Sequence, residues 1–216
     1  MPAAEVGPVW PEPLRRTLFL SYHTMPTFIT SLLRPLRWIL RLRHRCGYGI
    51  HSPFAFHLVT DVVYRPGRFY ADGELQRLHA TQPHPHIRLK DCRLLFRLAN
   101  RMRPASCLLA GLSPQGMEAR SLLLGSRHTQ LHNTPCSSDM ILCGSQWQAE
   151  AEGLLPLLSR GGLLVLTDIG SSRHRRKAWK NLTEMPQATV CFDLYYYGLI
   201  FNRPDLQRQH YKVNYY

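Results

Sequence analysis

Three short, mainly apolar runs constrain the fold of this chain more than any other feature. They lie at residues 106–111, 139–143 and 163–167, and each has the length of one strand. A helix-like stretch at residues 148–158 separates the second run from the third and ends before a pair of glycines. A strand, a helix and another strand in this order predict a parallel crossover, and fully apolar strands indicate a sheet that is buried on both faces. The sequence therefore predicts an α/β fold with a mostly parallel sheet.

The C-terminal part of the chain predicts strands of another kind. Residues 189–194 and 198–202 are apolar runs separated by a short turn, which indicates an antiparallel strand pair, and residues 210–214 follow as a last strand. The chain has 216 residues, of which 44% are hydrophobic, and this is enough for one substantial core.

The N-terminal part differs from the rest of the chain. Residues 1–24 are proline-rich without apolar periodicity, so we expect a disordered extension ahead of Met25. The uncharged stretch at 17–33 contains His23 and Pro26 and lacks a continuous apolar centre, which argues against a transmembrane segment or a signal peptide. We expect three parts: the extension at 1–24, an N-terminal helical region at 25–100 and an α/β domain at 101–216.

The six cysteines form no C-x-x-C pair and lie mostly in apolar runs. This pattern predicts reduced, buried thiols in a cytoplasmic protein, without a disulfide framework and without a metal site.

Basic residues exceed acidic ones by 27 to 14, which gives a net charge of +13. Two basic segments are candidates for an interaction surface: a helical stripe near residues 31–45 and the run "RHRRKAWK" at 173–180. Each segment is either a solvated helix face or a contact for nucleic acid or an anionic membrane surface. The arginines of the stripe that share one helix face are Arg34, Arg37, Arg41 and Arg45.

Three segments resemble a known family: "GIHSPFAFHLVTDVVY", "GGLLVLTDIGSSRHRRKAWKNL" and "TVCFDLYYYGLIFNRPDLQRQHYKV". They are similar to a group of class I S-adenosylmethionine-dependent methyltransferases, common in the Bacteroidetes and related to the O-methyltransferases. The resemblance implies a doubly wound, mostly parallel sheet with an N-terminal helical lid. It also implies methyl transfer from S-adenosylmethionine to an oxygen-bearing acceptor. Independently of the resemblance, Ser52-Pro53 has the form of a helix N-cap followed by the first helical residue.

The resemblance places the cofactor loop at "CLLAGLSPQG", residues 107–116. In the family, an acidic residue ends this strand and closely spaced glycines follow. Here Ala110 stands at the acidic position, Leu112 replaces the first glycine, and Gly111 is one place out of register with Gly116. The glycines with Ser113 also resemble the nucleophile elbow of hydrolases, but the second glycine comes one residue late and Pro114 removes an N–H group. The residues that remain as candidates for cofactor contacts are Gly111, Ser113 and Gly116.

The connection after this loop is short. Residues 111–138 number 28, whereas one strand–helix–strand unit takes about 30 residues or more. The family places two strands there, so we expect a shortened sheet with one helix and one short strand. His132 would then replace the acidic residue that holds the ribose; its alternative role is that of a surface-loop histidine.

The remaining candidate site residues lie near the predicted carboxyl edge of the sheet. Asp168 follows the third apolar run and is the candidate catalytic residue, although it has an equally good interpretation as a helix cap. One carboxylate is too few for a divalent cation, so no metal is expected. His51 is either a capping histidine or a residue of the substrate rim, together with Arg41, Arg45 and Arg173.

These observations give one main hypothesis and one alternative. The main hypothesis is a methyltransferase-like protein in which S-adenosylmethionine binding is weak or lost and catalysis is impaired or absent. The alternative is a non-catalytic basic module that binds nucleic acid or an anionic membrane surface.

Overall fold

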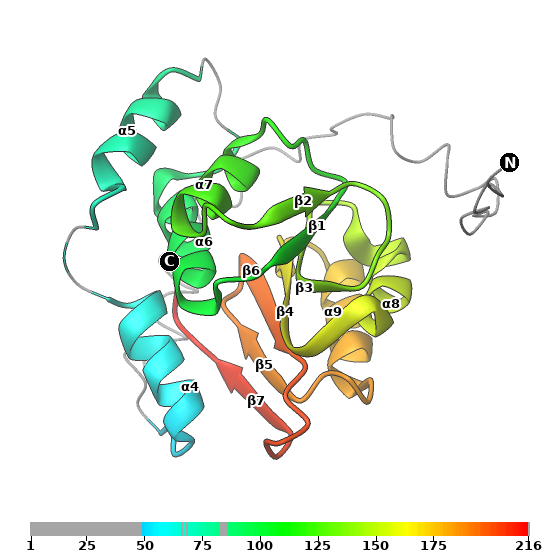
Figure 1. The fold of residues 1–216 in the computed structure, drawn as a ribbon. Coiled ribbons are helices and arrows are strands. Elements are labelled where there is room, and N and C mark those ends of the chain that lie inside the picture. Colours follow the sequence, from blue (N-terminus) through cyan, green and yellow to red (C-terminus); the bar gives the residue numbers. More distant parts are fainter. Residues whose placement is uncertain (1–48, 66, 68, 83–85, 216) are drawn as a thin grey trace, which may run out of the picture.

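The structure is a computed structural model that describes residues 49–65, 67, 69–82 and 86–215 (Figure 1). The expected extension at 1–24 and the arginine stripe of Arg34, Arg37, Arg41 and Arg45 lie outside the described residues. Among the described residues, no helix is both long and apolar enough to cross a membrane.

A seven-stranded, mostly parallel sheet forms the centre of the molecule, as the sequence predicts (Figure 1). Its first four strands are parallel to one another, β6 is antiparallel to both of its neighbours, and the last strand is parallel to β5. The predicted C-terminal antiparallel pair is therefore confirmed. In spatial order the strands are β2 (Gln130–His132), β1 (Ser106–Ala110), β3 (Ser138–Cys143), β4 (Leu158–Thr167), β6 (Tyr197–Phe201), β5 (Val190–Asp193) and β7 (Gln209–Lys212).

Helices cover both faces of the sheet. Successive side chains of a strand point to opposite faces, so one strand contributes to two buried clusters. In β1, Cys107 and Leu109 join one buried cluster, while Leu108 joins the other. The first cluster takes in α4 (Pro53–Leu58), the π-helical η3 (Val59–Val63), α5 (Asp72–Ala80), α6 (Leu89–Met102) and α7 (Met117–Gly125). The second takes in η4 (Trp147–Ala149), α8 (Ala151–Leu154), η5 (Leu155–Leu157) and α9 (Arg173–Glu184).

The predicted helix start in the "GIHSPF" segment is confirmed. The Ser52 hydroxyl accepts a hydrogen bond from the Ala55 N–H at 3.4 Å, and Pro53 is the first residue of α4. Leu58 and Val62, which follow, are buried in the first cluster.

The predicted helix at 148–158 is wrong in extent. The structure has only short turns of helix from Trp147 to Leu157, and β4 already begins at Leu158. Gly153 and Pro156 interrupt the segment, and both residues disfavour a continuous helix. Gly161, at φ +82°, lies inside the long strand, close to a shift in the register between β3 and β4.

The short connection between β1 and β3 holds one helix, α7, and one strand, β2. This is one strand fewer than the family resemblance implies. The fold class is therefore α/β, with a doubly wound, mostly parallel sheet.

Candidate functional site

The strand order reverses between β1 and β3, which lie side by side at the centre of the sheet. The chain leaves β1 through α7 on one face and leaves β3 through α8 on the other. In open α/β sheets, ligands bind at the carboxyl ends of the strands at this point, because the two connections part there and leave a crevice. The loops that follow β1, β3 and β4 therefore make up the candidate site.

The loop after β1 forms two hydrogen bonds within itself. Gly111 has φ +67°, and a turn follows in which the Gly116 N–H donates to the Ser113 carbonyl at 2.9 Å. The Gln115 N–H donates to the Ser113 hydroxyl at 3.3 Å, and Pro114 has no N–H group. Gly116 is the N-cap of α7. Two backbone donors of this segment, those of Gln115 and Gly116, are thus engaged within the loop.

The loops after β1 and β3 touch at the base of the crevice. The Gly144 N–H donates to the Ala110 carbonyl at 2.8 Å, which adds a backbone hydrogen bond beyond the end of β3. A Cβ atom on Gly144 would lie 2.7 Å from the Gly111 carbonyl oxygen and 3.3 Å from a methyl carbon of Leu112. The two loops therefore approach each other so closely at this level that only glycine fits at position 144.

The predicted acidic position and the predicted ribose position are also unlike those of a cofactor site. The Ala110 side chain packs against the buried cluster under α8 and α9. His132 ends β2 and pairs in register with Leu108, two residues before β1 ends. It therefore lies below the loop that carries Gly111, Ser113 and Gly116, and its role in ribose binding stays a prediction.

Asp168 lies at the carboxyl end of β4 in a left-handed backbone conformation, at φ +54°. Its carboxylate is 3.6 Å from a guanidinium nitrogen of Arg175, and its side chain is 48% exposed. Burial raises the pKa of the Asp168 carboxyl, and the Arg175 charge opposes that shift. The interpretation of Asp168 as the cap of the following helix is wrong, because the Ser172 hydroxyl caps α9 by accepting from the Arg175 N–H at 3.1 Å.

Arg175 also joins the loops after β3 and β4. It donates to the Ser145 carbonyl at 2.6 Å and to the Ser171 hydroxyl at 2.7 Å. The indole N–H of Trp147 donates to the Thr167 carbonyl at 2.6 Å and holds the same two loops together. Structural contacts therefore join the loops after β3 and β4.

Sequence reasoning missed a cluster of one arginine and two tyrosines near Asp168. The Arg88 guanidinium, at the start of α6, lies 4.2 Å from the ring centre of Tyr196 and forms two hydrogen bonds to Asp91. Tyr195 contacts Tyr196 edge to face, with ring centres 5.1 Å apart. Because these residues are far apart in the sequence, only the packing of α6 against the β5–β6 turn brings them together.

Two predicted rim residues lie at different places in the fold. Arg173 is exposed at the first position of α9. His51 is exposed beside Ser52, whose side chain bonds to Tyr211 in β7, the edge strand opposite to β2. The structure therefore does not bring His51 to the loop after β1, and Arg41 and Arg45 lie outside the described residues.

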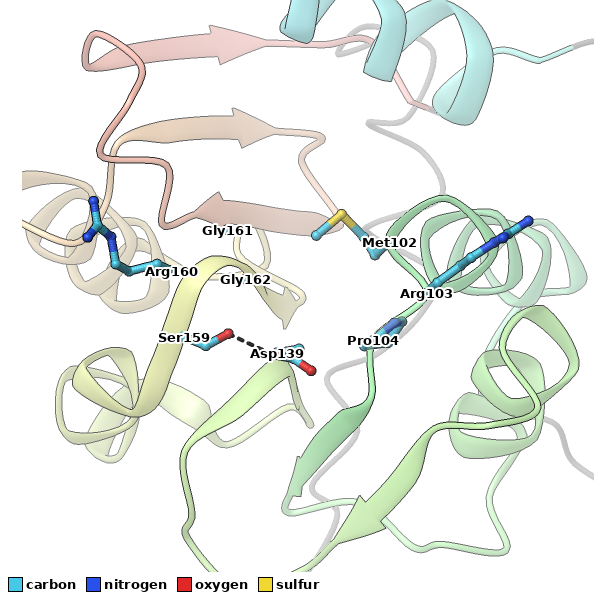
Figure 2. A pocket seen from close by; sticks show the side chains of 8 residues that line it. All are labelled: Met102, Arg103, Pro104, Asp139, Ser159, Arg160, Gly161 and Gly162. Atoms are coloured by element: carbon cyan, nitrogen blue, oxygen red, sulfur yellow. Dashed lines mark hydrogen bonds between the residues drawn. The ribbon is translucent and has the colours of Figure 1, made fainter.

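A cavity at the amino ends of the strands is unsuited to a cofactor. It encloses about 160 Å³, below the roughly 300–1,000 Å³ of small-molecule sites. Figure 2 shows that Asp139 lies at its centre, hydrogen-bonded to Ser159, while Arg103 and Arg160 point away. The Asp139 carboxylate accepts from the Ser159 hydroxyl at 2.9 Å and from the N–H groups of Ala105 and Ser106 at 3.0 and 3.3 Å. It is a structural connection between β1 and β4.

No protein-family model and no curated protein matches the sequence. Among solved structures, the fold is similar to an O-methyltransferase from Bacillus cereus in complex with SAH, with 14% identity, a TM-score of 0.42, and coverage of 67% of this chain and 94% of that one. An SAH-bound methyltransferase from Podospora anserina gives 12% identity, a TM-score of 0.47, and coverage of 84% and 98%. A protein from Corynebacterium glutamicum gives 16% identity, a TM-score of 0.44, and coverage of 74% and 100%. Similarities at this level assign no activity to the chain.

Proposed function

We propose that this chain is a methyltransferase-like protein of the O-methyltransferase type whose affinity for S-adenosylmethionine, and with it catalysis, is strongly reduced or lost. The sheet supports the first part of the proposal, because its strand reversal between β1 and β3 is of the type that binds nucleotide-like cofactors. The residues at that reversal support the second part.

The loop after β1 carries the proposal. A cofactor at this place would need free backbone donors and a carboxylate at the strand end, but Gln115 and Gly116 donate to Ser113 and position 110 holds alanine. The residues present therefore do not fit S-adenosylmethionine. Each missing charge-assisted hydrogen bond costs about 1.5–3 kcal/mol, so two of them lower the affinity by roughly two to four powers of ten.

Asp168 is the candidate acid–base residue in any methyl transfer that persists. Its carboxyl is half exposed at the carboxyl edge of the sheet, but Arg175 neutralises it. Among the described residues, no group of three or more His, Cys, Asp or Glu side chains could hold a metal ion. We therefore assign Asp168 no step that depends on a cation.

Calorimetric titration of the full chain with S-adenosylmethionine and S-adenosylhomocysteine tests the proposal. We expect dissociation constants in the submillimolar to millimolar range or weaker, since a cofactor normally held at micromolar levels would lose roughly two to four powers of ten. Ala110→Glu should not restore binding, because position 110 packs against the apolar cluster under α8 and α9. Micromolar binding by the unmodified protein, with methyl transfer that Asp168→Ala abolishes, would refute the proposal.

A second candidate function is binding of nucleic acid, and the exposed basic face of α9 favours it. Arg173 and Lys177 are exposed one turn apart, and the side chain of Lys180, a further turn along, is 78% exposed. A single-stranded oligonucleotide titrated over a salt series would reveal such binding. The double variant Arg173→Gln/Lys177→Gln should then reduce the slope of log affinity against log salt concentration by the contribution of about two charges. An unchanged slope would mean that this face is only solvated.

A further inference from the structure

The segments that lead into the parallel strands carry exposed arginines. Because β1, β2, β3 and β4 are parallel, these segments meet at the edge of the sheet where the strands begin. Strand β6 is antiparallel to β4 and β5, and β7 is parallel to β5, so β7 begins at the same edge. The basic edge consists of five exposed arginines: Arg101 at the end of α6, Arg103 before β1, Arg127 before β2, Arg160 near the start of β4, and Arg208 before β7.

The arginines of the basic edge form a row and not a cluster. The Thr129 hydroxyl donates to the Pro104 carbonyl at 2.7 Å, which holds the segment of Arg127 beside that of Arg103. The small cavity at the amino ends of the strands lies between Arg103 and Arg160, whose side chains point away from it on opposite sides (Figure 2). From β2 to β7 the edge spans six strand intervals, or about 29 Å. A ligand that contacts the whole row must therefore be extended.

Acidic residues offset this positive charge only in part. Those in the segments at this edge are Asp139, Asp205 and Glu184. The Asp139 carboxylate accepts hydrogen bonds from two backbone N–H groups and a serine hydroxyl. Asp205 forms an ion pair with Arg203 at 2.8 Å, and the Glu184 carboxylate lies 3.9 Å from Nζ of Lys180. All three carboxylates thus have partners outside the basic edge.

The arginines of the basic edge have no ion-pair partners of their own among the residues that the structure describes. A hydrogen bond from Arg203 lowers the pKa of Asp205 to about 2, and the more distant Arg160 charge contributes less to this shift. At the carboxyl ends of the strands the arginines are paired instead: Arg88 with Asp91, Arg175 with Asp168, and Arg176 with Asp193. The basic edge therefore keeps an excess of positive charge that faces solvent.

We propose that the basic edge binds the phosphate backbone of double-stranded nucleic acid without reading its bases. Guanidinium groups bind phosphate oxygens through paired N–H donors, and a row of about 29 Å approaches one helical turn of a duplex. Single strands are bound largely by stacking on aromatic side chains, and membrane surfaces by inserted apolar ones. The exposed large apolar side chains of the described chain are Phe56 and Tyr70, and neither lies at this edge. The surface is distinct from the basic face of α9 and from the loops around Asp168, so the inference is independent of the proposed methyltransferase-like function.

Fluorescence anisotropy of the full chain with a short labelled DNA duplex of mixed sequence, measured over a salt series, tests the proposal. We expect the affinity to fall by about a hundredfold or more between roughly 50 and 200 mM salt, as for four or more phosphate contacts. The double variants Arg101→Gln/Arg103→Gln and Arg127→Gln/Arg160→Gln should each reduce the slope of log affinity against log salt concentration by about two. A duplex of another sequence should give the same losses, because backbone contacts do not depend on the bases.

Arg77→Gln/Arg120→Gln is the matched control, because it removes the same charge from exposed positions on α5 and α7. It should leave the slope unchanged. The proposal is overturned if neither double variant at the basic edge changes the slope, or if the control reduces it equally. It is also overturned if only Arg173→Gln/Lys177→Gln weakens duplex binding, since the ligand would then lie on α9. Binding to vesicles that contain phosphatidylserine, without binding to the duplex, would overturn it as well.

Discussion

Gly125 is the residue at which the packing of α7 against α6 can be tested most directly. A Cβ atom at this position would lie 2.2 Å from the backbone carbonyl oxygen of Phe96 and 3.0 Å from Cβ of Ala99. Ordinary contact begins near 3.4 Å, so Gly125→Ala is short of room by 1.2 Å against an oxygen that cannot rotate away. The two helices must move apart, and α7 starts at the loop of the candidate site.

The size of the effect follows from two opposing contributions. Forced overpacking costs about 1–3 kcal/mol, and a clash with backbone belongs at the upper end of that range. Replacement of glycine by alanine in a helix gains about 0.5–1 kcal/mol. We therefore expect Gly125→Ala to lower the free energy of unfolding by about 2 kcal/mol.

Gly153→Ala in α8 is the matched control, because nothing lies within 4 Å of the Cβ it would add. It should leave stability unchanged or raise it by up to about 1 kcal/mol. Urea unfolding followed by circular dichroism measures both variants under the same conditions. If Gly125→Ala is as stable as Gly153→Ala, the close approach of α6 and α7 does not limit the fold and the reasoning is wrong.

The remaining predictions concern acidic and thiol groups. Asp139→Ala should cost about 2–4 kcal/mol of unfolding free energy, because its carboxylate accepts two N–H groups and the Ser159 hydroxyl; a loss below about 0.5 kcal/mol would contradict this. Burial raises the pKa of Asp168 above 3.8, so its stabilising contribution is present at lower pH and is lost as the pH rises through the raised value. Asp168→Asn should therefore gain stability relative to the wild type between pH 3 and pH 7 in thermal melts, and a pH-independent difference would exclude this. Burial also raises the pKa of Cys107 to about 12, so iodoacetamide near pH 8 should label the partly exposed Cys136 before Cys107. Mass spectrometry of the peptides gives the order of labelling. Labelling of Cys107 first would contradict this prediction.

The central strands could be predicted from the sequence because their signal is local. The runs at 106–111 and 139–143 correspond to β1 and β3 within one residue at each end, since apolar side chains fill both faces of each strand. The predicted helix at 148–158 failed for one reason outside the segment and one inside it. Leu158, the last residue of the predicted helix, is the first residue of β4 and pairs with β3. Gly153 and Pro156 disfavour a helix in the rest of the segment.

The site was less predictable than the sheet, because its contacts join distant segments. The substitutions at Ala110 and Leu112 are visible in the sequence, but the contact between Gly144 and Gly111 is not. Either Asp168 or Ser172 could cap α9 by residue type, and the left-handed backbone at Asp168 decides between them. The stacking of Arg88 on Tyr196 depends on how α6 packs, which no local pattern records.

The hydrogen bond from Gly144 to Ala110 has a consequence for how this chain can change over evolutionary time. A new acidic side chain at the end of β1 needs one substitution, but the close approach of the two loops is a property of two backbones. Any side chain at Gly144 would collide with the Gly111 carbonyl oxygen, so we expect this glycine to be retained. New ligand contacts are therefore expected to arise outside the contact between these two loops.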